Sequence, residues 1–172
     1  MFKALIIPVF LFVTVFAQAQ SAADLDKKNG FQDITMLSSA KGNIKLEFQK
    51  DVDHEKVPKS QVQYYEAAKG EYKTIGTVKI HSLEVWAYDD QIFQIRVITK
   101  QDPDLYKGLR QVFGKPAYSI REDLYYWSGE KVNLTYQAVD KNKLELVYFS
   151  QLLDDILKNE KKEEINSIAN DF

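Results

Sequence analysis

The two histidines, His54 and His81, are the residues best suited by type to acid–base chemistry near neutral pH. Neither lies in a known catalytic pattern, because the sequence has no Gly-x-Ser-x-Gly elbow and no His-Glu-x-x-His helix. Cysteine is absent, which excludes thiol catalysis, iron–sulfur clusters, disulfides and cysteine-bound zinc. We therefore interpret both histidines as ordinary strand or surface residues.

Acidic residues at alternate positions in the run 51–55 (DVDHE) are typical of the start of an EF-hand calcium loop. The match ends there, because Lys56 and Val62 stand where that loop needs its glycine and its final glutamate. Residues 51–59 are charged and include a proline, so we expect a surface loop. The seven glycines are scattered singly, so phosphate and dinucleotide loops are missing too. We predict no metal and no cofactor.

Glu84 is the one carboxylate that suggests hydrolysis. It lies two residues from Trp86 and near the pair Asp89-Asp90, and glycosidases place two carboxylates across a sugar cleft. The sequence does not fix a second carboxylate at the required distance. A small hydrolase is therefore the least favoured function, and we name no catalytic residue.

Aromatic residues, 13% of the chain, are the strongest remaining signal. Tyrosine and tryptophan form rigid, amphipathic contacts that suit protein interfaces and sugar stacking. Strand alternation sends the neighbours Tyr64 and Tyr65 to opposite sides, and likewise Tyr125 and Tyr126, so some rings must face away from the core. The alternative is that the C-terminal helix covers that face. The candidate partner-binding residues are Tyr64, Trp86, Tyr88, Phe93 and Tyr126.

Strand-like patterns in the first half of the chain must position most of these rings. They cover residues 61–67, 75–80, 83–88 and 92–99. The last two form a hairpin around Asp89-Asp90, in which Trp86 faces Phe93 and Ala87 faces Ile92. Both faces of this hairpin are then half apolar, so the sequence does not decide which one is buried.

A helix with clear ends follows. Asp102 is placed to cap it, Pro103 fits its first position, and the Gly114-Lys115-Pro116 triplet ends it after Phe113. Next, the segment 128–131 predicts a tight hairpin, followed by a strand over 143–149 and a C-terminal helix over 151–171. The residues expected to face inward are Tyr125, Trp127, Val132, Leu134 and Tyr136.

These elements predict an α+β fold: an antiparallel sheet of about six strands with one well-defined helix and a C-terminal helix. The order helix, then three strands, is clear over 102–149, and a weaker copy spans 38–99. Two α-β-β-β units in tandem are therefore one possible organisation of this single domain.

The first nineteen residues predict a cleaved signal peptide. Lys3 precedes an apolar run over 4–16, and Ala17-Gln18-Ala19 forms an A-x-A cleavage site. That run has thirteen residues, and at about 1.5 Å each a helix of this length is too short to cross a layer of roughly 30 Å. We expect residues 20–172 to form the exported domain, in the periplasm or secreted, without a transmembrane anchor.

The segment 109–116 (LRQVFGKP) followed by Tyr125-Tyr126-Trp127 resembles a helix, G-x-P and aromatic-strand pattern of small exported domains. The families are the outer-membrane assembly lipoproteins called SmpA/OmlA (BamE-like) and the β-lactamase-inhibitor-protein fold, which duplicates such a unit. The resemblance covers roughly residues 102–149 and implies a binding module. The lipid-attachment cysteine of the lipoproteins is missing here, and no catalytic residue is implied.

We therefore expect a non-enzymatic interaction module of the cell envelope or the secreted fraction that recognises a protein partner through aromatic strand surfaces. A small-ligand or glycan binder is the alternative. The formal charge of −2 lacks the basic surplus that nucleic-acid binding needs.

Overall fold

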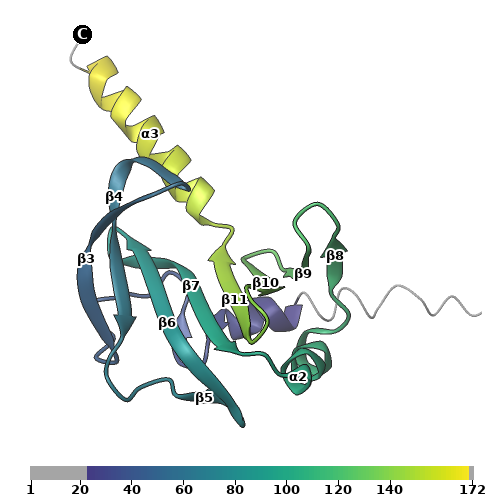
Figure 1. The fold of residues 1–172 in the computed structure, drawn as a ribbon. Coiled ribbons are helices and arrows are strands. Elements are labelled where there is room, and N and C mark those ends of the chain that lie inside the picture. Colours follow the sequence, from purple (N-terminus) through teal and green to yellow (C-terminus); the bar gives the residue numbers. More distant parts are fainter. Residues whose placement is uncertain (1–22, 171–172) are drawn as a thin grey trace, which may run out of the picture.

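The computed structural model describes residues 23–170, so the predicted signal peptide 1–19 lies outside the described residues. One antiparallel sheet of nine strands organises this part of the chain (Figure 1). In spatial order its strands are β3 (Leu46–His54), β4 (Val57–Ala67), β6 (Val78–Tyr88), β7 (Gln91–Lys100), β11 (Lys143–Ser150), β10 (Val132–Ala138), β9 (Leu124–Ser128) and β8 (Ala117–Ser119), while β5 (Thr74–Ile75) pairs with β6.

Helices and a small hairpin complete the fold. Residues 23–28 are helical, and a two-stranded hairpin of β1 (Gly30–Phe31) and β2 (Ile34–Thr35) follows them. α2 (Pro103–Phe113) joins β7 to β8, and α3 (Leu153–Asn170) follows β11. Figure 1 shows α3 running away from the sheet past the β3–β4 turn. No helix within residues 23–170 is long and apolar enough to cross a membrane.

The α+β class and the antiparallel sheet agree with the sequence, but the expectation of about six strands was too low. The largest difference is at 51–59, which was predicted to be a loop. The structure continues β3 to His54 and starts β4 at Val57, with a turn only at residues 55–56. β3 is an edge strand, so its charged side chains stay in water while its backbone pairs with β4.

The sheet order is symmetric about its central pair. Strands β3, β4, β6 and β7 lead to the centre from one side, and β8, β9, β10 and β11 lead to it from the other. A helical segment precedes each half, 23–28 before the first and α2 before the second. The tandem repeat of 38–99 and 102–149 stays a prediction, and this arrangement is consistent with it.

A β-bulge in the central hairpin separates its apolar and polar faces. The turn Asp89-Asp90 has positive φ at both residues, 47° and 64°, as a type I′ turn requires. Ala87 pairs with Ile92 as predicted, but Trp86 then pairs with Gln94, so Phe93 is an extra residue in β7. The predicted pair of Trp86 and Phe93 was therefore wrong, and the pairs from Trp86 to Ser82 shift by one residue, until a second irregularity between Ile80 and Ser82 restores the register.

This shift gives the hairpin one wholly apolar face. Val85 now faces Ile95 and Leu83 faces Val97, and all four side chains are buried. The opposite face carries Trp86 and the pair Glu84 and Arg96. The hairpin therefore has a clear inside and outside, which the two-residue turn alone did not provide.

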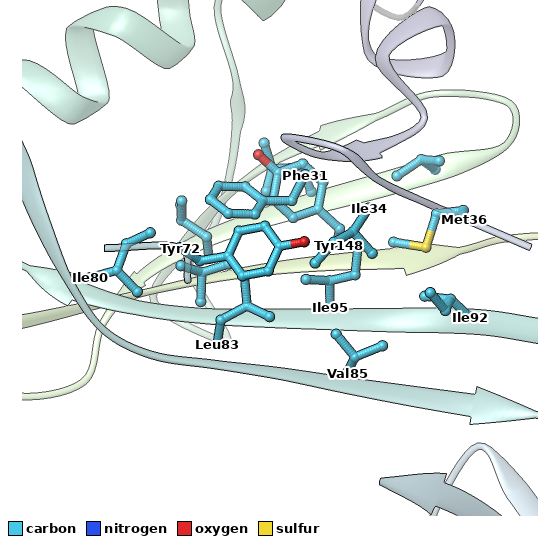
Figure 2. Packing of buried hydrophobic residues seen from close by; sticks show 14 of the residues in the cluster. Phe31, Ile34, Met36, Tyr72, Ile80, Leu83, Val85, Ile92, Ile95 and Tyr148 are labelled. Atoms are coloured by element: carbon cyan, nitrogen blue, oxygen red, sulfur yellow. The ribbon is translucent and has the colours of Figure 1, made fainter. Parts of the chain in front are cut away.

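The main core lies between this apolar face and the segments that cover it. Figure 2 shows Phe31, Ile34 and Met36 of the N-terminal segment packed over Val85 and Ile95 of the sheet. α2 adds Leu105 and Phe113 to the same core, and Leu25 of the helical segment 23–28 is fully buried in it. The structure thus has a further helix beyond the two that were predicted.

A second, smaller cluster lies on the other face of the sheet. Its buried members are Val57, Val62, Phe93 and Leu153. Leu153 belongs to the first turn of α3, and Leu157 packs against the same cluster one turn later. The first turns of α3 therefore pack on this face in the cluster that contains Phe93.

The predicted helix over 103–113 is present, with the predicted cap. The Asp102 carboxylate accepts a hydrogen bond of 2.9 Å from the Asp104 amide, and Pro103 opens the helix. The second hairpin differs in register, because Trp127 pairs with Leu134 and not with Val132. The shift is two residues, so each side chain keeps its predicted face: Trp127, Val132 and Leu134 are buried and Tyr136 packs against the core, whereas Tyr125, predicted to face inward, is 37% exposed near the sheet edge.

Asp26 explains this longer turn. Its carboxylate accepts hydrogen bonds from the amides of Glu130 (2.6 Å), Lys131 (2.8 Å) and Val132 (3.1 Å). These three N–H groups point to a residue about a hundred positions earlier in the chain. A side chain at Gly129 would overlap the same carboxylate. The helical segment 23–28 is thereby fixed to the β9–β10 turn.

We predict that Asp26→Ala lowers the free energy of unfolding by about 1–3 kcal/mol, because three turn amides lose their acceptor. Chemical denaturation followed by circular dichroism measures this. Asp24→Ala, an exposed carboxylate in the same helical segment, is the matched control and should change stability by less than about 0.5 kcal/mol. Equal stability of the two variants would contradict the role given to Asp26.

Candidate functional site

An open groove of about 700 Å³ lies on the sheet face opposite the main core, across strands β3, β4 and β6. We call it the Tyr64–Trp86 groove. Its lining residues combine two aromatic rings with charged and polar groups, and they are Gln49, Lys50, Val52, Asp53, Tyr64, Glu66, Glu84 and Trp86.

Strand register brings these side chains together. Tyr64 of β4 pairs with Trp86 of β6, and two residues along the same strands Glu66 pairs with Glu84. Pairs separated by two residues share a face of the sheet. On the other side of β4, Lys50 of β3 pairs with Tyr64, after a register shift between Phe48 and Lys50.

The two rings form the floor of the groove. Their centroids are 5.3 Å apart with an angle of 47° between the planes, a tilted packing that aromatic pairs favour. The Tyr64 hydroxyl donates a hydrogen bond of 2.8 Å to Glu66 Oε1. Burial, and after it this hydrogen bond, raises the pKa of the Tyr64 phenol well above its ordinary value. Tyr64 is therefore a neutral donor at physiological pH and holds the Glu66 carboxylate beside the rings.

An ionic network borders the groove toward the centre of the sheet. Arg96 Nη1 lies 3.1 Å from Glu84 Oε2, and Arg96 Nε pairs with Glu145 on β11. Glu84 is thus already neutralised by a neighbour, while Lys50, Asp53 and Glu66 are exposed. The charges available to a bound partner are therefore two carboxylates and one ammonium group.

His54 supports the aromatic floor from the β3–β4 turn. Its ring packs edge-on against Phe93 at 5.0 Å between centroids and lies 6.1 Å from the Trp86 ring. The Lys56 amide donates to His54 Nδ1 at 3.2 Å, so this nitrogen acts as an acceptor. Burial lowers the pKa of His54 below its ordinary 6.5. The imidazole is consequently neutral at physiological pH and works as a packing group.

The structure divides the five candidate residues into three groups. Tyr64 and Trp86 line the groove together, and Trp86 also packs against the second cluster. Tyr88 and Phe93 belong to the second cluster, where Phe93 is fully buried and its ring cannot meet a partner directly. Tyr126 is 38% exposed on the same face, but four strands separate β4 from β9, a distance of roughly 24 Å at about 4.8 Å per strand.

Sequence reasoning missed the polar half of the site. Lys50 was not singled out and Asp53 fell in the predicted loop 51–59, so the pairing of β3 with β4 was not considered. Glu66 could have been found from the sequence, because strand alternation already places it on the same side as Tyr64. Edge strands rich in charged residues have a weak strand pattern, which explains why Lys50 and Asp53 were not predicted to lie in a strand beside Tyr64.

Within residues 23–170, no three histidine or acidic side chains gather as metal ligands would. Glu84, the candidate for a glycosidase carboxylate, accepts from Ser82 Oγ at 3.3 Å and pairs with Arg96. These contacts are those of a structural ion network. The groove can thus bind a ligand through stacking, hydrogen bonds and charge.

We predict that acid destabilises the protein through His54. Its folded-state pKa lies below the unfolded value of 6.5, so the unfolded chain binds the proton more readily and stability falls as the pH drops below about 6.5. His54→Asn, whose side-chain oxygen can replace Nδ1 as acceptor, should flatten the stability profile between about pH 7 and pH 5. Denaturation at several pH values measures this.

The exposed His81 provides the matched control, and His81→Asn should keep the wild-type pH dependence of stability. An unchanged profile in His54→Asn, or a flattened one in His81→Asn, would contradict this assignment.

Comparisons of the chain with family models, with curated proteins and with solved structures found no match. The resemblance of residues 102–149 to exported binding domains therefore stays a prediction. The Tyr64–Trp86 groove is accordingly interpreted from its own geometry and charge.

Proposed function

We propose that the chain is an exported, non-enzymatic binding module of the cell envelope or the secreted fraction, and that it recognises a protein partner through the Tyr64–Trp86 groove. One observation carries this proposal. Two half-buried aromatic rings and a carboxylate fixed to one of them line an open groove on the sheet face opposite the main core.

The groove suits a basic side chain of the partner. A guanidinium or ammonium group is attracted to the face of a tryptophan or tyrosine ring, and arginine can stack on it while pairing with a carboxylate. Glu66 stands beside the rings for that pairing, and Asp53 adds a second carboxylate at the groove wall. Tryptophan, tyrosine and arginine are also the residues that dominate binding energy at protein interfaces.

Export rests on the sequence of the first nineteen residues, with a lysine, an apolar run and an A-x-A site. A partner in the envelope or outside the cell is consistent with that predicted location. The absence of cysteine also means that no disulfide is needed for the fold to form there.

A glycan or small ligand is the second candidate, and the size of the groove favours it. About 700 Å³ lies within the range of roughly 300–1,000 Å³ that small-molecule sites occupy. Trp86 would then stack on a sugar ring, with Gln49 and Asp53 as hydrogen-bonding groups. A hydrolase using Glu84 remains the least favoured function, because that carboxylate is paired with Arg96.

We predict that charge reversal at the groove weakens partner capture. The tagged protein is crosslinked mildly in the envelope fraction and in the medium of the source cell, and captured proteins are quantified. Glu66→Lys should reduce capture of the stoichiometric partner about tenfold or more, because it repels the basic anchor and removes the acceptor of Tyr64. Trp86→Ala should reduce it similarly.

Tyr126→Ala is the matched aromatic control, since its ring is exposed on the same face far from the groove. It should leave capture unchanged, and all three variants should keep a cooperative thermal transition. Equal capture by Glu66→Lys and wild type would refute the assignment of this groove. Absence of a protein partner, with glycans retained by wild type and lost in Trp86→Ala, would favour the second candidate.

A further inference from the structure

A second groove lies on the core side of the molecule, between α2, the β5–β6 turn and β1. Its volume is about 480 Å³, and β5 and α2 occupy the same end of the sheet (Figure 1). We call it the α2 groove. Most of its wall is apolar, formed mainly by Phe31, Ile75, Val78, Leu109, Val112 and Phe113. It is separate from the Tyr64–Trp86 groove, with which it shares no lining residue.

Gly108 keeps the wall of the α2 groove open. It lies in the interior of α2, where glycine lowers stability relative to alanine. A Cβ atom at this position would meet no other atom within 4 Å, so packing within the described chain does not require glycine. Gly76, on the opposite lip, differs, because its φ of +58° lies in the left-handed region that favours glycine. The unfilled space at Gly108 is therefore available to a ligand.

The rim of the α2 groove carries an available positive charge. The Lys28 ammonium group donates to the Gln32 carbonyl at 3.0 Å and, within residues 23–170, forms no ion pair. Asp104, the acidic residue on the same rim, is paired with Lys107 at 2.7 Å. An apolar channel with an unneutralised ammonium at its rim is complementary to an apolar chain that ends in an anionic group.

Val112 supports the same assignment. It lines the groove and is 56% exposed, while the buried Tyr148 lines the groove on its core side. Covering Val112 and the neighbouring wall with an alkyl chain would remove apolar surface from water, which favours binding.

We propose that the α2 groove binds a single-chain amphiphile with an anionic headgroup, such as a fatty acid. The alkyl chain lies along α2 past Gly108, and the headgroup pairs with Lys28. This site does not depend on the proposed function of the Tyr64–Trp86 groove, and an exported protein with both sites would bind a lipid-derived molecule and a partner on opposite faces of its sheet.

Calorimetric titration of the purified protein with dodecanoate, below its micelle concentration, tests the proposal. The wild-type protein should bind with saturable stoichiometry near one. Gly108→Leu should weaken binding about tenfold or more because the new side chain fills the groove, while Gln111→Leu, exposed on α2 outside the groove, should not. Gly108→Ala should weaken binding less and raise the thermal midpoint, because alanine favours the helix.

The headgroup is tested separately. Lys28→Glu should weaken dodecanoate binding several-fold but leave the affinity for dodecyltrimethylammonium equal or higher. Several results would overturn the proposal: no saturable binding of dodecanoate, equal affinity in Gly108→Leu, or tighter binding of the cationic amphiphile by the wild type. Because Gly108→Ala is expected to be the more stable protein, a loss of affinity in it cannot arise from unfolding.

Discussion

The extra residue Phe93 in β7 is the constraint on which both faces of the sheet depend. In a regular hairpin from the Asp89-Asp90 turn, each face would carry both apolar and polar residues, because a shift of one residue exchanges the two faces of a strand. The bulge restores the alternation. Val85 and Ile95 then join a single row of core residues that continues through Tyr148, Leu134 and Trp127 across the sheet.

The same bulge determines what the opposite face can do. It aligns Glu84 with Arg96 across β6 and β7, while the regular pairing of β4 with β6 sets Trp86 beside Tyr64, so the ionic border lies next to the aromatic floor. The ring of Phe93 itself is buried in the second cluster, together with Leu153 of α3. A residue that appeared from its type to be part of a binding surface is therefore a structural support for that surface, and the groove beside it remains uncovered.

Local signals in the sequence were sufficient for the elements whose structure is local. The Asp102-Pro103 start of α2 and the turn at Asp89-Asp90 depend on neighbouring residues, and both were predicted correctly. The extra residue Phe93 packs with Val57, Val62 and Leu153 of distant elements, and the long β9–β10 turn bonds to Asp26, so no short window of sequence contains these contacts. The edge strand β3 was missed because its charged residues are typical of a loop. Half of the Tyr64–Trp86 groove therefore could not be assembled from sequence.

Two glycines show how structural and functional requirements can be distinguished. A side chain at Gly129 would overlap the Asp26 carboxylate, so the fold itself explains that glycine. Gly108 has no such neighbour, although it weakens a helix that is otherwise well capped. A residue that lowers stability without any contact to justify it, in the wall of an apolar groove, is the kind of local inconsistency expected at functional sites. The cost of Gly108 is therefore best explained by a ligand that occupies the space beside it, which connects the stability of α2 directly to binding.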